Sequence, residues 1–187
     1  RLHNVLREQN EPFEIIWVND GSKDGSWPVI SNLCSSGSWH RGINLARNYG
    51  QHNALLCGIR CARYDKLITL DDDLQNPPEE IPKLIAKFKE GCDLVYGIPQ
   101  KNKHPFWRQW TSDVIKLALS TTLNFKLANI VSPFRIFKTQ LRSEFSQHRN
   151  PFVNIDILLS WGARKKNAVS VVHIERSSGK SGYDLQR

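Results

Sequence analysis

The chain has 187 residues, of which 40% are hydrophobic, and this is enough for one packed domain. No apolar run approaches the roughly eighteen residues that a membrane-spanning helix requires, so none is expected within the sequence. The net charge of +8 arises in residues 101–187, which carry 15 Lys and Arg against 5 Asp and Glu, whereas residues 1–100 carry 11 against 13. An acidic half followed by a basic half suits a protein that binds anions with the help of a cation. Because the basic half contains no recognisable nucleic-acid recognition module, we expect no nucleic-acid partner.

The predicted elements alternate between strands and helices along the chain. Strands are expected over residues 13–18, 42–45, 67–70, 93–97, 132–137 and 169–174, and helices over residues 2–9, 53–62 and 105–125. A further helix has a marked start and end: Asn76 can cap it, two prolines suit its first turn, and Gly91 ends it. This alternation predicts an α/β fold with a mostly parallel, nucleotide-binding sheet and helices on both faces.

Three consecutive carboxylates, Asp71, Asp72 and Asp73, follow the buried strand that ends at Leu70. Ligands of open α/β sheets bind at this carboxyl edge of the strands. Alternate residues of an extended segment point the same way, so Asp71 and Asp73 can share one divalent cation, with the amide oxygen of Gln75 two residues further on. Hard oxygen ligands favour Mg²⁺ or Mn²⁺, which commonly bridge proteins to substrate phosphates.

These motifs also have simpler interpretations. An acidic run at a strand end is usually a solvated turn, but here a strand precedes it and a helix start follows it. A calcium loop counted from Asp71 fails, because Asn76 replaces the required glycine and Pro82 the required glutamate. Near the end of the chain, Gly179-Lys180-Ser181 lacks the earlier glycine of a phosphate-binding P-loop, since Ile174 stands there. The segment remains a cationic stretch able to contact phosphates or, alternatively, a mobile tail.

Together, five motifs resemble the inverting family-2 glycosyltransferases, most closely the polyprenyl-phosphate (dolichyl-phosphate type) branch. They run in the family's order over nearly the whole chain: VNDGSKDGS (18–26), LARNYGQHNALLCGI (45–59), LDDDLQNPPEEIPKL (70–84), SPFRIF (132–137) and ERSSGKSGYDL (175–185). The resemblance implies a Rossmann-like domain of the GT-A type in a single catalytic domain, residues 1–187. Residues 1–100 would form its nucleotide and metal half, and residues 101–187 its basic acceptor-side half.

The resemblance also assigns roles to individual residues, with Asp73 and Arg135 as the catalytic pair. Asp71, Asp73 and Gln75 would hold the Mg²⁺ or Mn²⁺ ion. The nucleotide-sugar would be bound by Asp20, Arg47, Asp71 and Asp72. The donor or acceptor phosphates would be bound by Arg108, Arg135, Arg176, Lys180 and Ser181.

The implied reaction transfers a sugar from a nucleotide-diphosphate sugar to a polyprenyl phosphate, with inversion. An ionised lipid phosphate needs no general base, whereas a saccharide hydroxyl would need one, and Asp156 is then the nearest candidate. That aspartate can equally be a surface or capping residue at a helix start. A third interpretation is a domain that binds a nucleotide-sugar or a membrane without catalysing transfer.

The sequence also departs from the family pattern. The family's first central strand, which contacts the nucleotide, has no counterpart, so we expect a fragment truncated at both ends. A lipid acceptor implies a site at the cytoplasmic face of the cell membrane. Within residues 105–125, Trp107 and Trp110 lie beside basic residues, so this helix is either ordinary core or an interfacial helix on a membrane surface. The sugar, the nucleobase and the formation of a homo-oligomer are left open.

Overall fold

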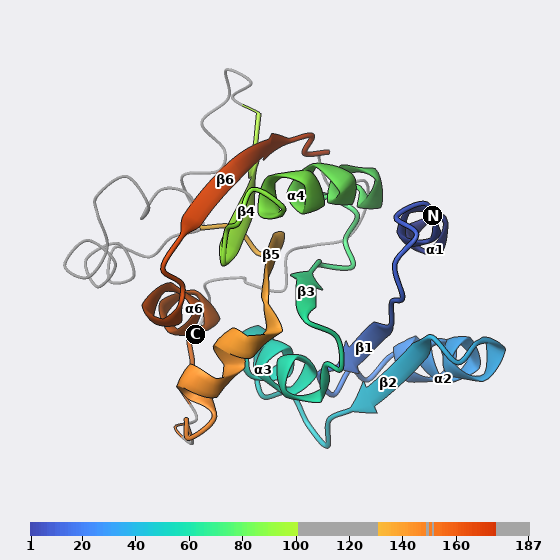
Figure 1. Ribbon diagram of the computed structural model, residues 1–187. Helices are drawn as coiled ribbons and strands as arrows, with labels where there is room; N and C mark the ends of the chain where they lie inside the picture. The colour runs from blue at the N-terminus through green and yellow to red at the C-terminus, as the bar shows by residue number, and fades with distance from the viewer. Residues whose placement is uncertain (101–130, 149, 151, 175–187) are drawn as a thin grey trace.

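The computed structural model describes residues 1–100, 131–148, 150 and 152–174 (Figure 1). The helix expected over residues 105–125 therefore lies outside the described residues. The described strands are β1 (Ile15–Asn19), β2 (His40–Asn44), β3 (Lys66–Thr69), β4 (Leu94–Pro99), β5 (Arg135–Lys138) and β6 (Lys166–Val171). The helices are α1 (Leu2–Arg7), α2 (Ser26–Ser36), α3 (Gln51–Cys61), α4 (Ile81–Phe88) and α6 (Ile155–Gly162), with two 3-10 helices, η1 (Pro78–Glu80) and η3 (Thr139–Phe145).

The described strands form two sheets. β1 and β2 pair in parallel, and the other four strands form a second sheet in the order β3-β5-β4-β6. Within that sheet β4 and β6 are parallel, whereas β5 runs antiparallel to both β3 and β4. The expected fold class, an α/β protein with a mostly parallel sheet, is confirmed, and β5 is the exception among the described strands.

The four-stranded sheet is covered on both faces, because its side chains alternate between two hydrophobic clusters. Val95 and Ile136 pack against α4 on one face, and Leu94 and Phe137 pack against α3, α6 and η3 on the other. All four side chains have no exposed surface. Figure 1 shows α4 on one side of this sheet, with α3 and α6 on the other. This core fixes the strand ends that carry the acidic residues.

The start of α4 differs from the expectation in its cap. Ile81, Leu84, Ile85 and Phe88 form its buried face, as the periodicity predicts. The cap prediction for Asn76 was wrong: a 3-10 turn over Pro78–Glu80 precedes the helix, and Glu80 is the residue at its N-cap. The two prolines belong to this turn and not to the helix, so α4 begins later than the sequence indicated. Asn76 is instead buried, at 6% exposure.

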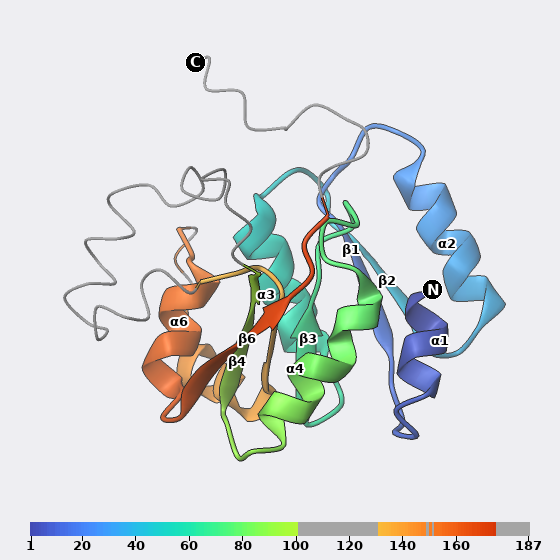
Figure 2. The ribbon, with the colours of Figure 1, turned by 90° about the horizontal axis from the view of Figure 1, so that it is seen from above.

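A gap separates the two sheets, between β1 and β3. Neither strand has a partner on this side among the described strands, and Figures 1 and 2 show β1 and β2 set apart from β3. An apolar cavity of about 280 Å³ lies there, lined by residues of both strands together with α1, α3 and α4. The first central strand, which we expected to be missing from the chain, would belong in this position. In the described part of the chain, no helix is long and apolar enough to cross a membrane.

Candidate active site

The acidic residues follow β3 in a tight loop. The backbone N–H of Gln75 donates to Asp73 Oδ1 at 3.1 Å, and Leu74 between them has a positive φ of 59°. Asp71 and Asp73 are partly buried, whereas Asp72 is exposed. Burial raises the pKa of Asp71, and the negative charge of Asp73 raises it further, while Gln51 and Arg135 act in the opposite direction. This geometry leaves two anionic groups that repel each other, which a shared cation would relieve.

The protein alone supplies few ligands at this loop. Among the described residues, no three His, Cys, Asp or Glu side chains lie close enough together to hold a metal ion. Two carboxylates with an amide fit Mg²⁺ or Mn²⁺ better than a metal that needs a complete cage of protein ligands. Mg²⁺ in particular usually keeps several waters and takes its remaining ligands from substrate phosphates. The donor set therefore fits a cation that is completed by a diphosphate.

Asp20, expected to bind the nucleotide, lies at the end of β1 and holds the start of α3. Its Oδ1 accepts from the N–H of Tyr49 at 2.8 Å, and its Oδ2 accepts from the N–H of Gly50 at 2.9 Å. The next residue, Gly21, has a φ of 68°, and a Cβ there would lie 2.4 Å from the carbonyl carbon of Arg47. The turn after β1 and the segment before α3 are thus in direct backbone contact, which only glycine permits.

Arg47, the other nucleotide-side candidate, is exposed on the same segment. Its guanidinium lies over the ring of Tyr49, 4.9 Å from the ring centroid. Both side chains are accessible from solvent. The structure thus brings Arg47, in the segment before α3, close to the turn of Asp20 and Gly21, at the edge where β1 ends.

Gln51, the first residue of α3, was not among the predicted site residues. Its Nε2 donates to Asp71 Oδ1 at 2.9 Å. Because Asp20 holds Gly50 and Gln51 contacts Asp71, the ends of β1 and β3 meet at the start of α3. Figure 2 shows these segments gathered at one end of the molecule. The sequence signal was present in the ARNYGQ segment, where a glutamine follows the glycine that starts a helix.

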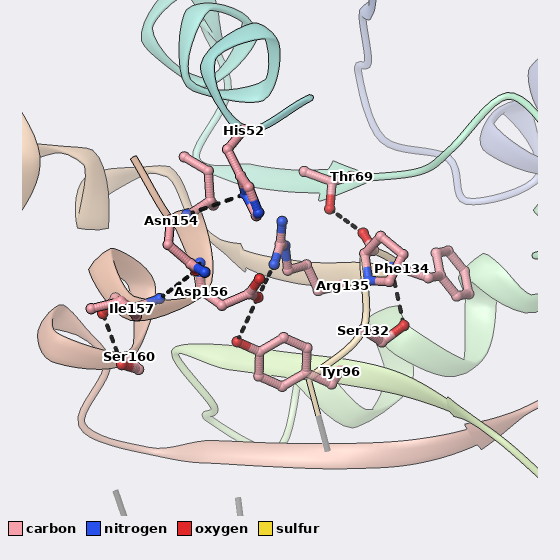
Figure 3. A network of polar contacts seen from close by, with 12 residues as sticks. His52, Thr69, Tyr96, Ser132, Phe134, Arg135, Asn154, Asp156, Ile157 and Ser160 are labelled. Atoms are coloured by element: carbon pink, nitrogen blue, oxygen red, sulfur yellow. Dashed lines mark hydrogen bonds and ion pairs between the residues drawn. The ribbon is translucent and has the colours of Figure 1, made fainter. Parts of the chain in front are cut away.

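Arg135 lies deeper in the protein than a phosphate ligand at the surface would. The side chain is 1% exposed, and its Nη1 forms an ion pair with Asp156 Oδ1. Tyr96 donates its hydroxyl to the same carboxylate oxygen at 3.2 Å (Figure 3). Burial raises the pKa of Tyr96, and the adjacent Asp156 raises it further, so the hydroxyl keeps its proton. Arg135 Nε is buried without a hydrogen-bond partner.

Asp156 is neither at the surface nor a helix cap. Asn154 caps α6, and its side chain accepts from the N–H groups of Asp156 and Ile157. His52, in the first turn of α3, faces this region, and its Nδ1 accepts from the N–H of Ile155 at 3.4 Å. Burial lowers the pKa of His52, which agrees with a neutral ring accepting at this nitrogen. Asp156 is therefore an internal partner of Arg135, at 7% exposure.

The segment that follows β6 lies against the acidic loop. The N–H of Ile174 donates to the carbonyl oxygen of Gln75 at 2.9 Å, and the N–H of Val172 donates to Glu80 Oε2, also at 2.9 Å. Ile174, the last described residue, is therefore held directly beside the loop of Asp71 and Asp73. The predicted phosphate contacts Arg108, Arg176, Lys180 and Ser181 lie outside the described residues.

Comparisons with known proteins agree with this arrangement. The chain is 35% identical over its full length to an undecaprenyl-phosphate 4-deoxy-4-formamido-L-arabinose transferase of Pseudomonas aeruginosa, and covers 56% of that protein. A protein of the same description from Enterobacter sp. is 35% identical over 94% of the chain, which covers 54% of its length. The chain thus spans about half the length of these curated relatives.

Solved structures share the fold at low sequence identity. S. aureus TarS (residues 1–349) in complex with UDP matches with a TM-score of 0.62 and 17% identity, over 89% of this chain and 52% of that one. Glucosyl-3-phosphoglycerate synthase from Mycobacterium tuberculosis, solved with Mn²⁺, UDP and phosphoglyceric acid, matches with a TM-score of 0.57 and 18% identity, over 89% and 61% of the two chains. The GT-A fold expected from the motifs is confirmed. The model of the family described as glycosyl transferase family 2 matches residues 1–148, and the chain belongs to this family.

Proposed function

We propose that the protein transfers a sugar from a nucleotide-diphosphate sugar to a polyprenyl phosphate, with inversion and with a divalent cation. One observation carries this proposal: the loop of Asp71 and Asp73 lies beside Ile174, where the chain enters its cationic sequence. In the sequence, the basic residues Arg176 and Lys180 follow soon after Ile174. We propose that the metal on Asp71 and Asp73 holds the diphosphate on one side and that these basic groups hold it on the other. The names of the curated relatives support a polyprenyl phosphate as acceptor.

The residues of the site would bind the cation, the nucleotide and the phosphates. Asp71, Asp73 and Gln75 would hold Mg²⁺ or Mn²⁺, which when bound stabilises the negative charge that grows on the departing diphosphate. Asp20, in the turn after β1, and Arg47, in the segment before α3, would contact the nucleotide together with exposed Asp72. Arg108, Arg176, Lys180 and Ser181 would contact the donor or acceptor phosphates. The mycobacterial synthase solved with Mn²⁺ and UDP supports a divalent cation in this fold.

The environment of Asp156 favours a phosphate acceptor over a sugar hydroxyl. A general base must reach the proton that it removes, but Asp156 is buried and already bound by Arg135 and Tyr96. A lipid phosphate is ionised at neutral pH and needs only to be positioned. Arg135 would then support the site from inside, by fixing Asp156 and adding positive charge near Asp71.

The lipid acceptor implies where the protein works. A polyprenyl phosphate presents its head group at a bilayer surface, so the acidic edge would face a membrane. We place this edge at the cytoplasmic side of the cell membrane, where nucleotide-sugars are present. The basic composition of residues 101–187 supports attraction to anionic lipid head groups.

The gap between the sheets fits a further strand from outside residues 1–187. Because β1 and β3 both end at the start of α3, they run in the same direction, and a strand between them would pair in parallel with each. Its carboxyl end would emerge between Asp20 and Asp71, where the nucleotide is proposed to bind. In the full-length protein, the amide protons on the facing edges of β1 and β3 should exchange more slowly than in residues 1–187 alone. Equal exchange would argue against a strand in the gap.

The metal role is tested by sugar transfer in the full-length protein. Excess chelator should abolish transfer, and Asp73→Asn should lower turnover by about 10²–10³-fold, because a group that stabilises developing charge is lost. Asp65→Asn, an exposed carboxylate at the opposite end of β3, is the matched control and should retain activity. Transfer that persists in chelator, or after Asp73→Asn, would contradict the proposal.

The acceptor is tested with Asp156→Asn. For a phosphate acceptor, turnover corrected for the folded fraction should be reduced but not abolished, because only the support from the Arg135–Asp156 pair is lost, and nucleotide binding should be retained. Complete loss of turnover with intact nucleotide binding would instead identify Asp156 as a base and favour a hydroxyl acceptor.

A further inference from the structure

Gln51 and Asp71 form a side-chain contact between two elements of the candidate site. Gln51 begins α3, whereas Asp71 follows β3, and 2.9 Å separates Gln51 Nε2 from Asp71 Oδ1. Only the N–H₂ end of the amide can donate to a carboxylate, so the orientation of the Gln51 side chain follows from its partner. The contact occupies one lone pair of Oδ1 and leaves the other lone pairs of both oxygens for a cation.

The backbone that carries Gln51 is fixed on two sides. Asp20 binds the N–H groups of Tyr49 and Gly50, directly before Gln51. On the opposite side, His52 accepts from the N–H of Ile155, at the start of α6. Within the turn itself, the side chain of Asn53 donates to the carbonyl oxygen of Tyr49 at 2.8 Å. The position of the backbone at Gln51 is therefore fixed by contacts with the turn after β1, with α3 itself and with the start of α6.

Asp71 needs such support because its neighbours repel it. Asp72 and Asp73 follow directly, and like charges this close repel one another, so a donor that holds the Asp71 carboxylate offsets that repulsion. A neutral donor is suited to this task, since it orients the carboxylate without competing for the cation, as a lysine or arginine would. Partners that orient a metal ligand in this way commonly contribute about 10–100-fold to metal affinity.

We propose that Gln51 is a positioning residue, which holds Asp71 in the orientation needed to share a divalent cation with Asp73. This inference rests on the proposed function, because it assumes that Asp71 and Asp73 bind the cation. It adds a role for the first turn of α3: that turn joins the nucleotide-side turn at Asp20 to the cation ligands.

The test measures Mn²⁺ binding to the full-length protein by electron paramagnetic resonance in the presence of a nucleoside diphosphate. Two variants remove the donor: Gln51→Ala, and Gln51→Met, which keeps the length of the side chain and suits a helix. Both should weaken Mn²⁺ binding by about 10-fold or more. Gln140→Ala is the control, since this glutamine is exposed on η3, away from the acidic loop.

A purely structural role would give a different pattern. If Gln51 acts through the cation, saturating Mn²⁺ should restore the turnover of Gln51→Met to nearly the wild-type value, and the melting temperature should match that of the Gln140→Ala control. Unchanged Mn²⁺ affinity in both Gln51 variants, or a loss of turnover that excess Mn²⁺ does not restore, would overturn the inference alone. Absence of Mn²⁺ binding in the wild-type protein would overturn the proposed function as well.

Discussion

The two sheets are built differently, although both contribute to one edge. In the four-stranded sheet, strand residues such as Leu94 and Ile136 have no exposed surface, and helices cover both faces. In the two-stranded sheet, the central residues of β1 and β2 are only partly buried, and α2 beside them has no buried residue. The acidic loop follows β3, which is itself only partly buried but pairs along its length with the buried strand β5, whereas the turn at Asp20 is attached through polar contacts to the segment directly before α3.

This difference indicates how the site is assembled. Pairing with the buried strand β5 determines where β3 ends and hence where Asp71 lies. The nucleotide side depends on a few directional contacts, namely the hydrogen bonds of Asp20 and the close approach of Gly21 to the segment before α3. We expect core substitutions to act on the whole fold, and substitutions at these contacts to act locally.

The largest contrast should come from the same substitution in the two sheets. Ile136→Ala, in a fully buried position of β5, should lower the free energy of unfolding by about 2–5 kcal/mol, because it removes packed methyl groups and leaves a cavity. Ile43→Ala, in partly buried β2, should lower it by less than about 2 kcal/mol. Urea denaturation followed by circular dichroism measures both. Equal losses would mean that the two sheets are packed to the same degree.

A smaller effect is expected where the turn after β1 touches the segment before α3. Gly21→Ala adds a Cβ that would lie 2.4 Å from the Arg47 carbonyl carbon, at a positive φ, and should lower the free energy of unfolding by about 1–3 kcal/mol. Gly25→Ala is the matched control, since a Cβ there meets no atom within 4 Å. Gly21→Ala should lower the urea midpoint and weaken nucleotide binding, whereas Gly25→Ala should change neither. Similar behaviour of the two variants would contradict this contact.

The smallest effect concerns pH and the aromatic contacts of the two-stranded sheet. Trp17 Nε1 donates to His40 Nδ1 at 2.8 Å, and the ring of Trp39 lies 3.7 Å from that of His40. Burial lowers the pKa of His40 below its ordinary value of 6.5, and the nearby His3 lowers it further. The unfolded chain therefore takes up the proton more readily than the folded one. His40 contributes stability above pH 6.5, and this is lost as the pH falls through the lower pKa of the folded state.

The measurement compares His40→Gln with the wild-type protein, because a glutamine oxygen can still accept from Trp17 but does not titrate. When the pH is lowered from 7.5 to 5.5, the urea midpoint should decrease more in the wild-type protein than in the variant. Tryptophan fluorescence should report the change in the wild-type protein, since Trp17 and Trp39 both lie beside His40. Equal falls in the two proteins would assign the acid sensitivity to other groups.

Much of the fold was predictable because the signals are local. Alternating strand and helix patterns located all six described strands to within a few residues. The cation site at Asp71, Asp73 and Gln75 stays a prediction from their spacing. The contacts that complete the site are not local. Arg135 and Asp156 are 21 residues apart and lie on different elements, so no spacing rule connects them. The Gln51 contact depends on where the start of α3 meets the end of β3, which packing decides.

The facing edges of β1 and β3 have a consequence for the association of copies of this chain. Each edge presents backbone N–H and C=O groups to an apolar cavity, and unpaired strand edges readily recruit extended segments of other molecules. Copies of the chain should therefore associate through this cavity as concentration rises. A short peptide with alternating apolar residues should compete for the same cavity and keep the chain monomeric.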